Sequence, residues 1–405
     1  MTASAFLAAA SFGAFWGVWG AAVPLVQQQA GVSAGQLGVA LLFVGAGALP
    51  AMLVAGRALD RWGLRIAGLL IGSLGLAGAG LALTAVNLTS LCIGLAVVGA
   101  TSGAADVAIN ALAGRAEQVA DRPVITRAHG TFSSLVVLAS LGTGLAWAAS
   151  LPLAVPFTAV AVLSLAAGGF LITRPPTGLM ARRQDRIRVA DPVPFGRQRI
   201  VPCLLIGALG ALAFASENAH QSWSALFAHH ELHTGPGLSS VAPAVFAGTV
   251  AITRFAIGGL TAAHDRTVLL AGASTAACGA LLIATAPTLY VAAIGLAAAA
   301  AGTAVLFPTL VGVVSRNVEE AHRGRATSVV TTVSYLGFLL SPVYVGLWAD
   351  AVGLRGAMVA VSALAVVLFV VTPHLLRLSG FSHPDHSGRR SAAEPGHQGS
   401  SPRTV

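Results

Sequence analysis

Twelve apolar stretches, each about 20 residues or longer, constrain most strongly what this chain can fold into. They lie at about 4–26, 34–56, 64–85, 89–113, 125–149, 153–173, 201–228, 238–261, 267–286, 288–314, 325–348 and 355–376. A helix needs about 20 apolar residues to cross the hydrocarbon of a bilayer, and its backbone polar groups must be satisfied within the segment. The stretches are too long for barrel strands, so the sequence predicts an all-α membrane protein with twelve transmembrane helices.

The low content of charged residues supports this class. Only 9% of the 405 residues are charged and the mean hydropathy is +0.81, whereas a water-soluble domain carries about 25% charged residues. The first stretch lacks a positive leading segment and a small-residue cleavage site, so we interpret it as a membrane helix rather than a signal peptide. The expected surroundings are a lipid bilayer, and the net charge of +9 is no indication of nucleic-acid binding.

The arginines alternate between successive gaps. All 23 basic residues are arginine. When each gap is numbered by the apolar stretch that precedes it, every arginine except Arg355 lies in or near an even-numbered gap or in the C-terminal tail. Positive residues remain on the cytoplasmic side of a membrane protein. The alternation therefore predicts an inner-membrane protein with both termini in the cytoplasm, and an odd number of helices would destroy it.

An arginine- and proline-rich linker divides the chain into two halves. We expect a six-helix bundle at 1–173, a cytoplasmic linker at 174–199, a second six-helix bundle at 200–378 and a disordered cytoplasmic tail at 379–405. The tail is rich in Ser, Gly, His, Pro and Arg, which is typical of disorder. The helix between about 64 and 85 carries five glycines, which predict close helix packing.

A cluster of charged residues and glycines separates the second and third apolar stretches. Residues 56–65 follow the pattern Gly-x-x-x-Asp-Arg-x-Gly-x-Arg. An incomplete copy of this pattern lies near 259–266, and a closer copy, Gly-x-x-x-Asp-x-x-Gly-Leu-Arg, lies at 346–355. The copy falls on the opposite side of the membrane in the predicted topology. An ordinary solvated turn is the alternative interpretation of either segment.

The pattern at 56–65 resembles the signature of the loop between helices 2 and 3 in the major facilitator superfamily. A narrower resemblance, to a poorly characterised bacterial branch with sugar-porter-like relatives, is carried by four short segments: 106–110, 129–133, 217–224 and 323–326. No arginine lies within 91–113, which departs from the proton-antiporter pattern of the superfamily.

The resemblance implies two pseudo-symmetric bundles, a cavity near the middle of the membrane and alternating access by rocking of the halves. It also implies that Asp60 helps to hold the cytoplasmic side closed, by accepting hydrogen bonds at the start of helix 11 near 323–326, or by pairing with Arg115. The predicted gating residues are Gly56, Asp60, Arg61, Gly63, Arg65 and Arg115.

Ionisable groups within the apolar stretches are functional candidates, because their burial in a membrane is costly. Glu217 lies near the middle of helix 7, close to Asn218 and Gln221. A carboxylate removed from water has an increased tendency to take up a proton. We therefore expect proton coupling or substrate binding here, the alternative being a structural hydrogen bond to a neighbouring helix.

Further candidates surround the predicted cavity. Asp106 and Asn110 share a face of helix 4, and His129 lies at the start of helix 5, which predicts a polar gate or proton path, or else interhelical bracing. Aromatic candidates for the cavity wall are Trp16, Trp19, Phe307 and Tyr335. Lipid-facing packing explains the two tryptophans equally well.

No cofactor or metal is expected. We interpret the histidines at 229–233 as part of a solvated turn, since their spacing matches no metal-ligand pattern. The chain contains no phosphate-binding Walker sequence, which argues against an ATP-driven pump. No nucleophile–base arrangement is recognisable within the stretches.

The predicted function is that of a secondary transporter, not an enzyme. It would move a small polar or amphipathic solute by alternating access, couple that movement to protons through Glu217, and act as a monomer. The alternatives are a multidrug or metabolite exporter of the same fold, a membrane-embedded enzyme and a non-transporting sensor.

Overall fold

The computed structural model describes residues 2–120, 124–173, 197–257 and 264–381, and every regular element in these ranges is helical. The elements are α1 (Thr2–Ala30), α2 (Ala34–Trp62), the 3₁₀ turn η1 (Gly63–Ile66), α3 (Ala67–Thr84), α4 (Leu88–Ala120), α5 (Val124–Ala148), α6 (Ala154–Thr173), α7 (Arg197–His230), α8 (Pro236–Ser239), α9 (Val241–Ile257), α10 (Asp265–Ala284), α11 (Leu289–Ala304), α12 (Leu306–Asn317) and α13 (Glu320–Ser379). The predicted all-α class is confirmed.

Ten helical segments in the described ranges are long and apolar enough to cross a membrane. Two of them, Ala34–Thr84 and His322–Ser379, have 51 and 58 residues, which is enough for two crossings each. The first is interrupted at Gly63 and the second at Gly353. The pattern is therefore consistent with the twelve crossings expected from the sequence.

The stretch expected as one helix at 288–314 contains an interruption. α11 ends at Ala304 and α12 begins at Leu306. Pro308 follows within the first turn of α12, and its ring nitrogen has no hydrogen to donate to the carbonyl of Ala304. Val305 lies between the two helices with φ −92° and ψ −18°, and its carbonyl accepts hydrogen bonds from the amide and hydroxyl of Thr309.

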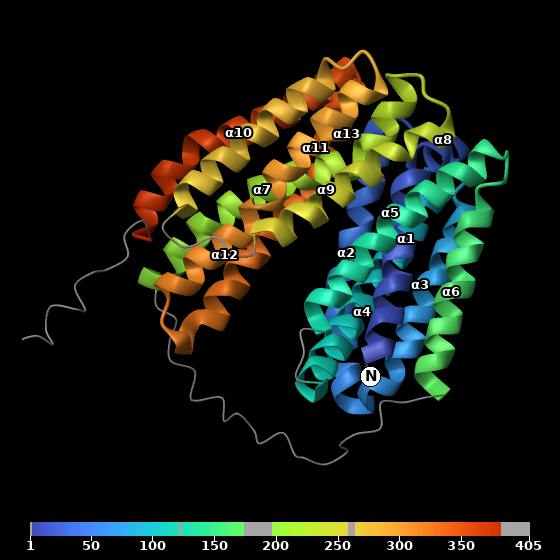
Figure 1. Cartoon of the computed structure of the whole chain (residues 1–405), viewed down its shortest axis with the longest axis horizontal. Coiled ribbons are helices and arrows are strands. Elements are labelled where there is room, and N and C mark those ends of the chain that lie inside the picture. The colour runs from blue at the N-terminus through green and yellow to red at the C-terminus, as the bar shows by residue number, and fades with distance from the viewer. Residues whose placement is uncertain (1, 121–123, 174–196, 258–263, 382–405) are drawn as a thin grey trace, which may run out of the picture.

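The helices form two groups that are joined at one end. α1 to α6 make up the first bundle and α7 to α13 the second (Figure 1). We call the end where α6 finishes and α7 begins the linker end, and the opposite end the far end. Figure 1 shows the bundles meeting near the far end, beside α8, and diverging toward the linker end. Most of the linker expected at 174–199 and of the tail expected at 379–405 lies outside the described residues.

Small residues bring neighbouring helices close together within each bundle. A Cβ at Gly75 of α3 would lie 2.8 Å from the Cα of Ala161 in α6, and Gly68 crosses Gly168 without any intervening side chain. Gly279 and Gly295 do the same between α10 and α11. Four of the five glycines expected to pack in the third helix have such neighbours; Gly80 has open space.

The outer surface of both bundles is apolar. Large side chains such as Leu145, Ile252 and Tyr290 are more than two-thirds exposed. A soluble monomer rarely exposes contiguous apolar surface on this scale. The buried residues form clusters inside the bundles, so the apolar exterior fits contact with lipid chains.

Contacts between the bundles are concentrated toward the far end on the side of α2 and α13. Gly38 of α2 lies against the carbonyl of Pro342 in α13, and Gly45 lies against Leu339. On the other side of the interface the Ser140 hydroxyl of α5 donates to the carbonyl of Ser240, at 2.9 Å. These contacts join the two bundles near the far end.

Candidate functional site

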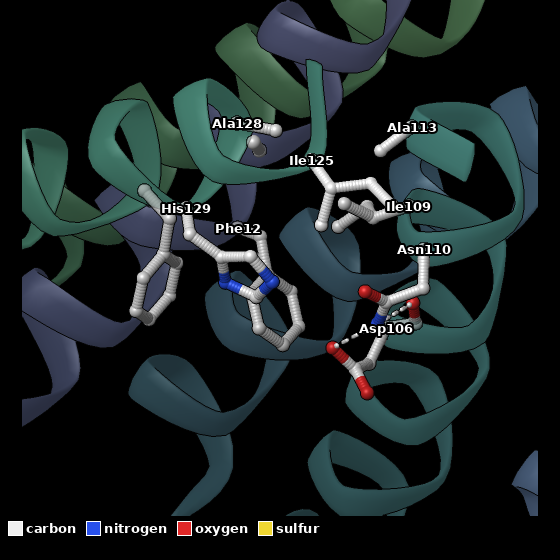
Figure 2. Close-up of a pocket in the computed structure, with 10 residues that line it drawn as sticks. Phe12, Asp106, Ile109, Asn110, Ala113, Ile125, Ala128 and His129 are labelled. Atoms are coloured by element: carbon white, nitrogen blue, oxygen red, sulfur yellow. Dashed lines mark hydrogen bonds between the residues drawn. The ribbon is translucent and has the colours of Figure 1, made fainter. Parts of the chain in front are cut away.

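A small pocket lies in the first bundle between α1, α4 and α5. Asp106, Asn110 and His129 contribute its polar side chains, while Phe12 and Phe132 supply aromatic walls. Figure 2 shows Asp106 and Asn110 on one helix of this pocket with His129 on another. The Asn110 amide donates to the Asp106 carboxylate at 3.2 Å and to its carbonyl at 3.0 Å. The structure thus brings together the three polar residues that the sequence placed in one cluster.

An ion pair with a largely enclosed carboxylate lies in the second bundle. The Arg254 guanidinium of α9 donates to the Glu217 carboxylate of α7 at 2.9 Å. The Glu217 side chain is 14% exposed and that of Arg254 is 47% exposed, so the pair is reachable from one side. A carboxylate this enclosed requires a compensating partner. Arg254 supplies it, and sequence analysis had assigned that arginine only to membrane orientation.

Asn218 holds α7 against α13 beside the ion pair. Its amide nitrogen donates to the carbonyl of Phe338 at 2.7 Å, and its amide oxygen accepts from the Ser222 hydroxyl at 2.9 Å. The contact with Phe338 lies between helices of one bundle. Asn218 therefore positions this face of α7, in addition to lining the cavity.

A second pocket lies between the two bundles. Trp16 and Trp19 of α1 line it from the first bundle, and Asn218, Gln221 and Ser222 of α7 line it from the second. Trp19 is buried and Trp16 half-buried. The structure thus places both tryptophans on a cavity wall, where the sequence had left lipid-facing packing open.

Four aromatic rings form a cluster beside these pockets. Phe214 of α7 lies with its ring centroid 4.2 Å from that of Phe307 and 5.5 Å from that of Tyr335, and 6.4 Å from that of Phe338. Phe214 was missed by sequence analysis because one more Phe in an apolar helix carries no distinctive signal.

The two pockets have volumes of about 100 and 50 Å³. Ligand sites for small molecules usually enclose about 300–1,000 Å³. Each pocket therefore has room for part of a solute, and a whole solute would also occupy the space between the bundles.

The predicted gating segment is exposed in this conformation. Asp60, Arg61, Arg65 and Arg115 are exposed, and Asp60 has no hydrogen bond or ion pair with any of the described residues. The Arg61 guanidinium lies 5.6 Å from the centroid of the Trp62 ring. Within the described residues, no hydrogen bond or ion pair joins Asp60 to Arg115 or to the start of α13, its two predicted partners. The latch stays a prediction for another conformation.

The family of the chain follows from comparison with known proteins. The model of the Major Facilitator Superfamily matches residues 4–263 and 210–403, which together cover almost the whole chain. No curated protein sequence matched.

Several solved transporters have the same fold. The nucleoside transporter NupG is 14% identical, with a TM-score of 0.71, covering 93% of this chain and 99% of its own. A bacterial homolog of the human lysosomal transporter Spinster, inward-facing and occupied, is 17% identical (TM-score 0.70; 93% and 96% covered). The inward-open xylose transporter XylE from E. coli is 15% identical (TM-score 0.70; 96% and 97% covered). These identities establish the fold alone. With apolar helices in the described ranges that are consistent with twelve crossings, two bundles and a family match along its length, the chain belongs to the major facilitator superfamily and is a transporter, not an enzyme.

Proposed function

We propose that the protein is a secondary active transporter that moves a small polar or amphipathic solute across the inner membrane by proton-coupled alternating access. The arginine distribution assigns the linker end to the cytoplasm. With that orientation, the far-end contacts between Gly38 and Pro342 and between Ser140 and Ser240 close the external side. The present conformation then faces the cytoplasm.

The observation that carries the proposal is the ion pair between Glu217 and Arg254. A proton bound to Glu217 would remove its negative charge and release Arg254, which then needs a different partner. Because the two residues lie on different helices, loss of the pair changes how α7 and α9 are held. Protonation is thereby linked to the arrangement of the second bundle.

Asp106 and His129 supply a second place for protons, on the first bundle. Both side chains line the pocket between α1, α4 and α5. Residues of α1 also line the pocket between the bundles, so this second place for protons would lie beside the space that the solute occupies.

The lining of the second pocket, between the bundles, supports an uncharged solute with a polar edge and an apolar face. Gln221 and Asn218 offer amide hydrogen bonds, and Trp16 offers a flat apolar surface. Glu217 is already neutralised by Arg254. Monosaccharides and nucleosides have this chemistry, and solved transporters of similar fold carry xylose and nucleosides in their names. Uptake is the favoured direction.

Proteoliposomes with and without an imposed pH gradient provide the test. We expect solute uptake from a panel of sugars and nucleosides to rise with an inward proton gradient, and Glu217→Gln to lose the gradient dependence, because a neutral amide cannot exchange a proton. Asp265→Asn is the matched control, since Asp265 also pairs with an arginine, Arg316, but outside the two pockets. Uptake that ignores the gradient in the unmodified protein would contradict proton coupling, and accumulation only with the gradient reversed would indicate an exporter.

A further inference from the structure

The segments at 56–65 and 346–355, here called the first and second motifs, share backbone geometry as well as spacing. Gly63 ends α2 with φ 72° and ψ −175°. Gly353 interrupts α13 with φ 80° and ψ 168°. Positive φ combined with an extended ψ is essentially restricted to glycine. Each motif thus ends one membrane helix and starts the next with the same kink, and each places an aspartate three residues before it.

The second motif is engaged across the boundary between the bundles. Ser33, which caps the start of α2, donates from its hydroxyl to the Asp350 carboxylate at 2.8 Å. The same hydroxyl accepts from the amide of Gln36 at 3.1 Å. Asp350 therefore places a negative charge at the N-terminus of α2, where the helix dipole favours an anion.

Glycines allow this approach. A Cβ at Gly346 would lie 2.7 Å from the carbonyl oxygen of Ala34 and 3.1 Å from the Cα of Gly35. The place of a side chain at Gly35 is occupied by the carboxylate of Asp350. The backbones of α2 and α13 consequently touch at the far end, with the aspartate seated on the glycine.

Arg355 anchors the second motif within its own bundle. Its guanidinium lies 3.1 Å from the Glu231 carboxylate and donates to the carbonyls of Ala284 and Ala286, each at 3.0 Å. These partners lie at the far ends of α7 and α10. The arginine thereby holds the end of the second bundle together while Asp350 reaches the first bundle.

We propose that residues 346–355 form a latch that holds the far end closed, reciprocal to the latch predicted for residues 56–65 at the linker end. The reciprocity is geometric. In the second motif, an aspartate at the end of one half of α13 meets the start of α2. In the first motif, Asp60 at the end of α2 would meet the start of α13. One latch closes as the other opens, and the inference rests on the alternating access proposed above.

Distances between spin labels in the two bundles test the latch without any solute. In a protein whose Cys92, Cys203 and Cys278 are replaced, labels at positions 86 and 287 report the far end, and labels at 119 and 378 report the linker end. All four positions are exposed.

We expect Asp350→Asn to raise the ratio of far-end-open to far-end-closed molecules by about five-fold, the size expected for loss of one exposed charge-assisted hydrogen bond with a helix-dipole contribution. Ser33→Ala should raise it by about two-fold.

Asp60→Asn is the matched control, because it makes the same chemical change in the first motif. It should move the ratio in the opposite direction, since it weakens only the state in which the linker end is closed. Unchanged far-end distances in both Asp350→Asn and Ser33→Ala, or an identical shift with Asp60→Asn, would overturn the latch. Failure of the proposed function is a separate result, namely absence of gradient-driven uptake by the unmodified protein.

Discussion

The first and second motifs place the same residue types at the same spacing but have different surroundings. Both aspartates are exposed, but Asp350 accepts a hydrogen bond from Ser33 of the opposite bundle, whereas Asp60 has no partner among the described residues. Gly346 touches α2, whereas Gly56 has nothing within 4 Å of a Cβ added to it. The comparison shows that the motif specifies a helix end with a presented carboxylate. In the proposed cycle, whether that carboxylate is engaged depends on which end of the transporter is closed.

The largest effect is expected from filling the contact glycines. Gly346→Leu would force α2 and α13 apart, because the nearest atoms are backbone that cannot move aside. Overpacking of this kind costs about 1–3 kcal/mol or more, so we expect the far end to open and transport to fall by at least about ten-fold. Spin-label distances at both ends and vesicle uptake provide the measurements.

Gly56→Leu sharpens this comparison. Its side chain has free space in the present conformation, so the state closed at the far end should persist while closure of the linker end is hindered. The two leucine variants should thus shift the distances in opposite directions. A shift in the same direction would show that the motifs are not reciprocal.

A smaller effect, equal in both motifs, is expected from Gly63→Ala and Gly353→Ala. Their positive φ values of 72° and 80° impose strain of about 1–3 kcal/mol on any residue with a Cβ. Unfolding in detergent, followed by circular dichroism, should show both variants destabilised. Gly324→Ala is the control, since Gly324 lies within α13 with open space around it. If Gly353→Ala proves as harmless as that control, the kink does not require glycine.

The smallest effect should separate the two arginines. Arg355→Gln loses the ion pair with Glu231, but its side chain is 41% exposed, so we expect a cost of about 1 kcal/mol. Arg65→Gln should change stability by less than about 0.5 kcal/mol, because Arg65 is an exposed surface charge. Hydrogen exchange in the turn at 284–286 should rise only in the Arg355 variant. Equal exchange in both variants would remove the distinction.

Sequence analysis grouped several candidate residues that lie near one another in the structure, but it could not identify all of their partners. Asp106 and Asn110 were predictable as neighbours because they lie one helical turn apart. Arg254, the partner of Glu217, lies 37 residues away on another helix, and as an arginine near a helix end it fitted membrane orientation equally well. The clustering of Phe307 and Tyr335 around Phe214 likewise depends on how three helices pack.

The sequence by itself determined the membrane class, the alternation of arginines and the two helix-ending motifs, because hydrophobic length, charge and glycine conformation are local properties. Only the tertiary structure decided which motif is engaged. The Ser33–Asp350 contact joins residues 317 positions apart, and it exists because the two bundles touch at the far end. A local pattern cannot specify that contact, since the aspartate of an almost identical pattern at 56–65 has no partner among the described residues at the other end.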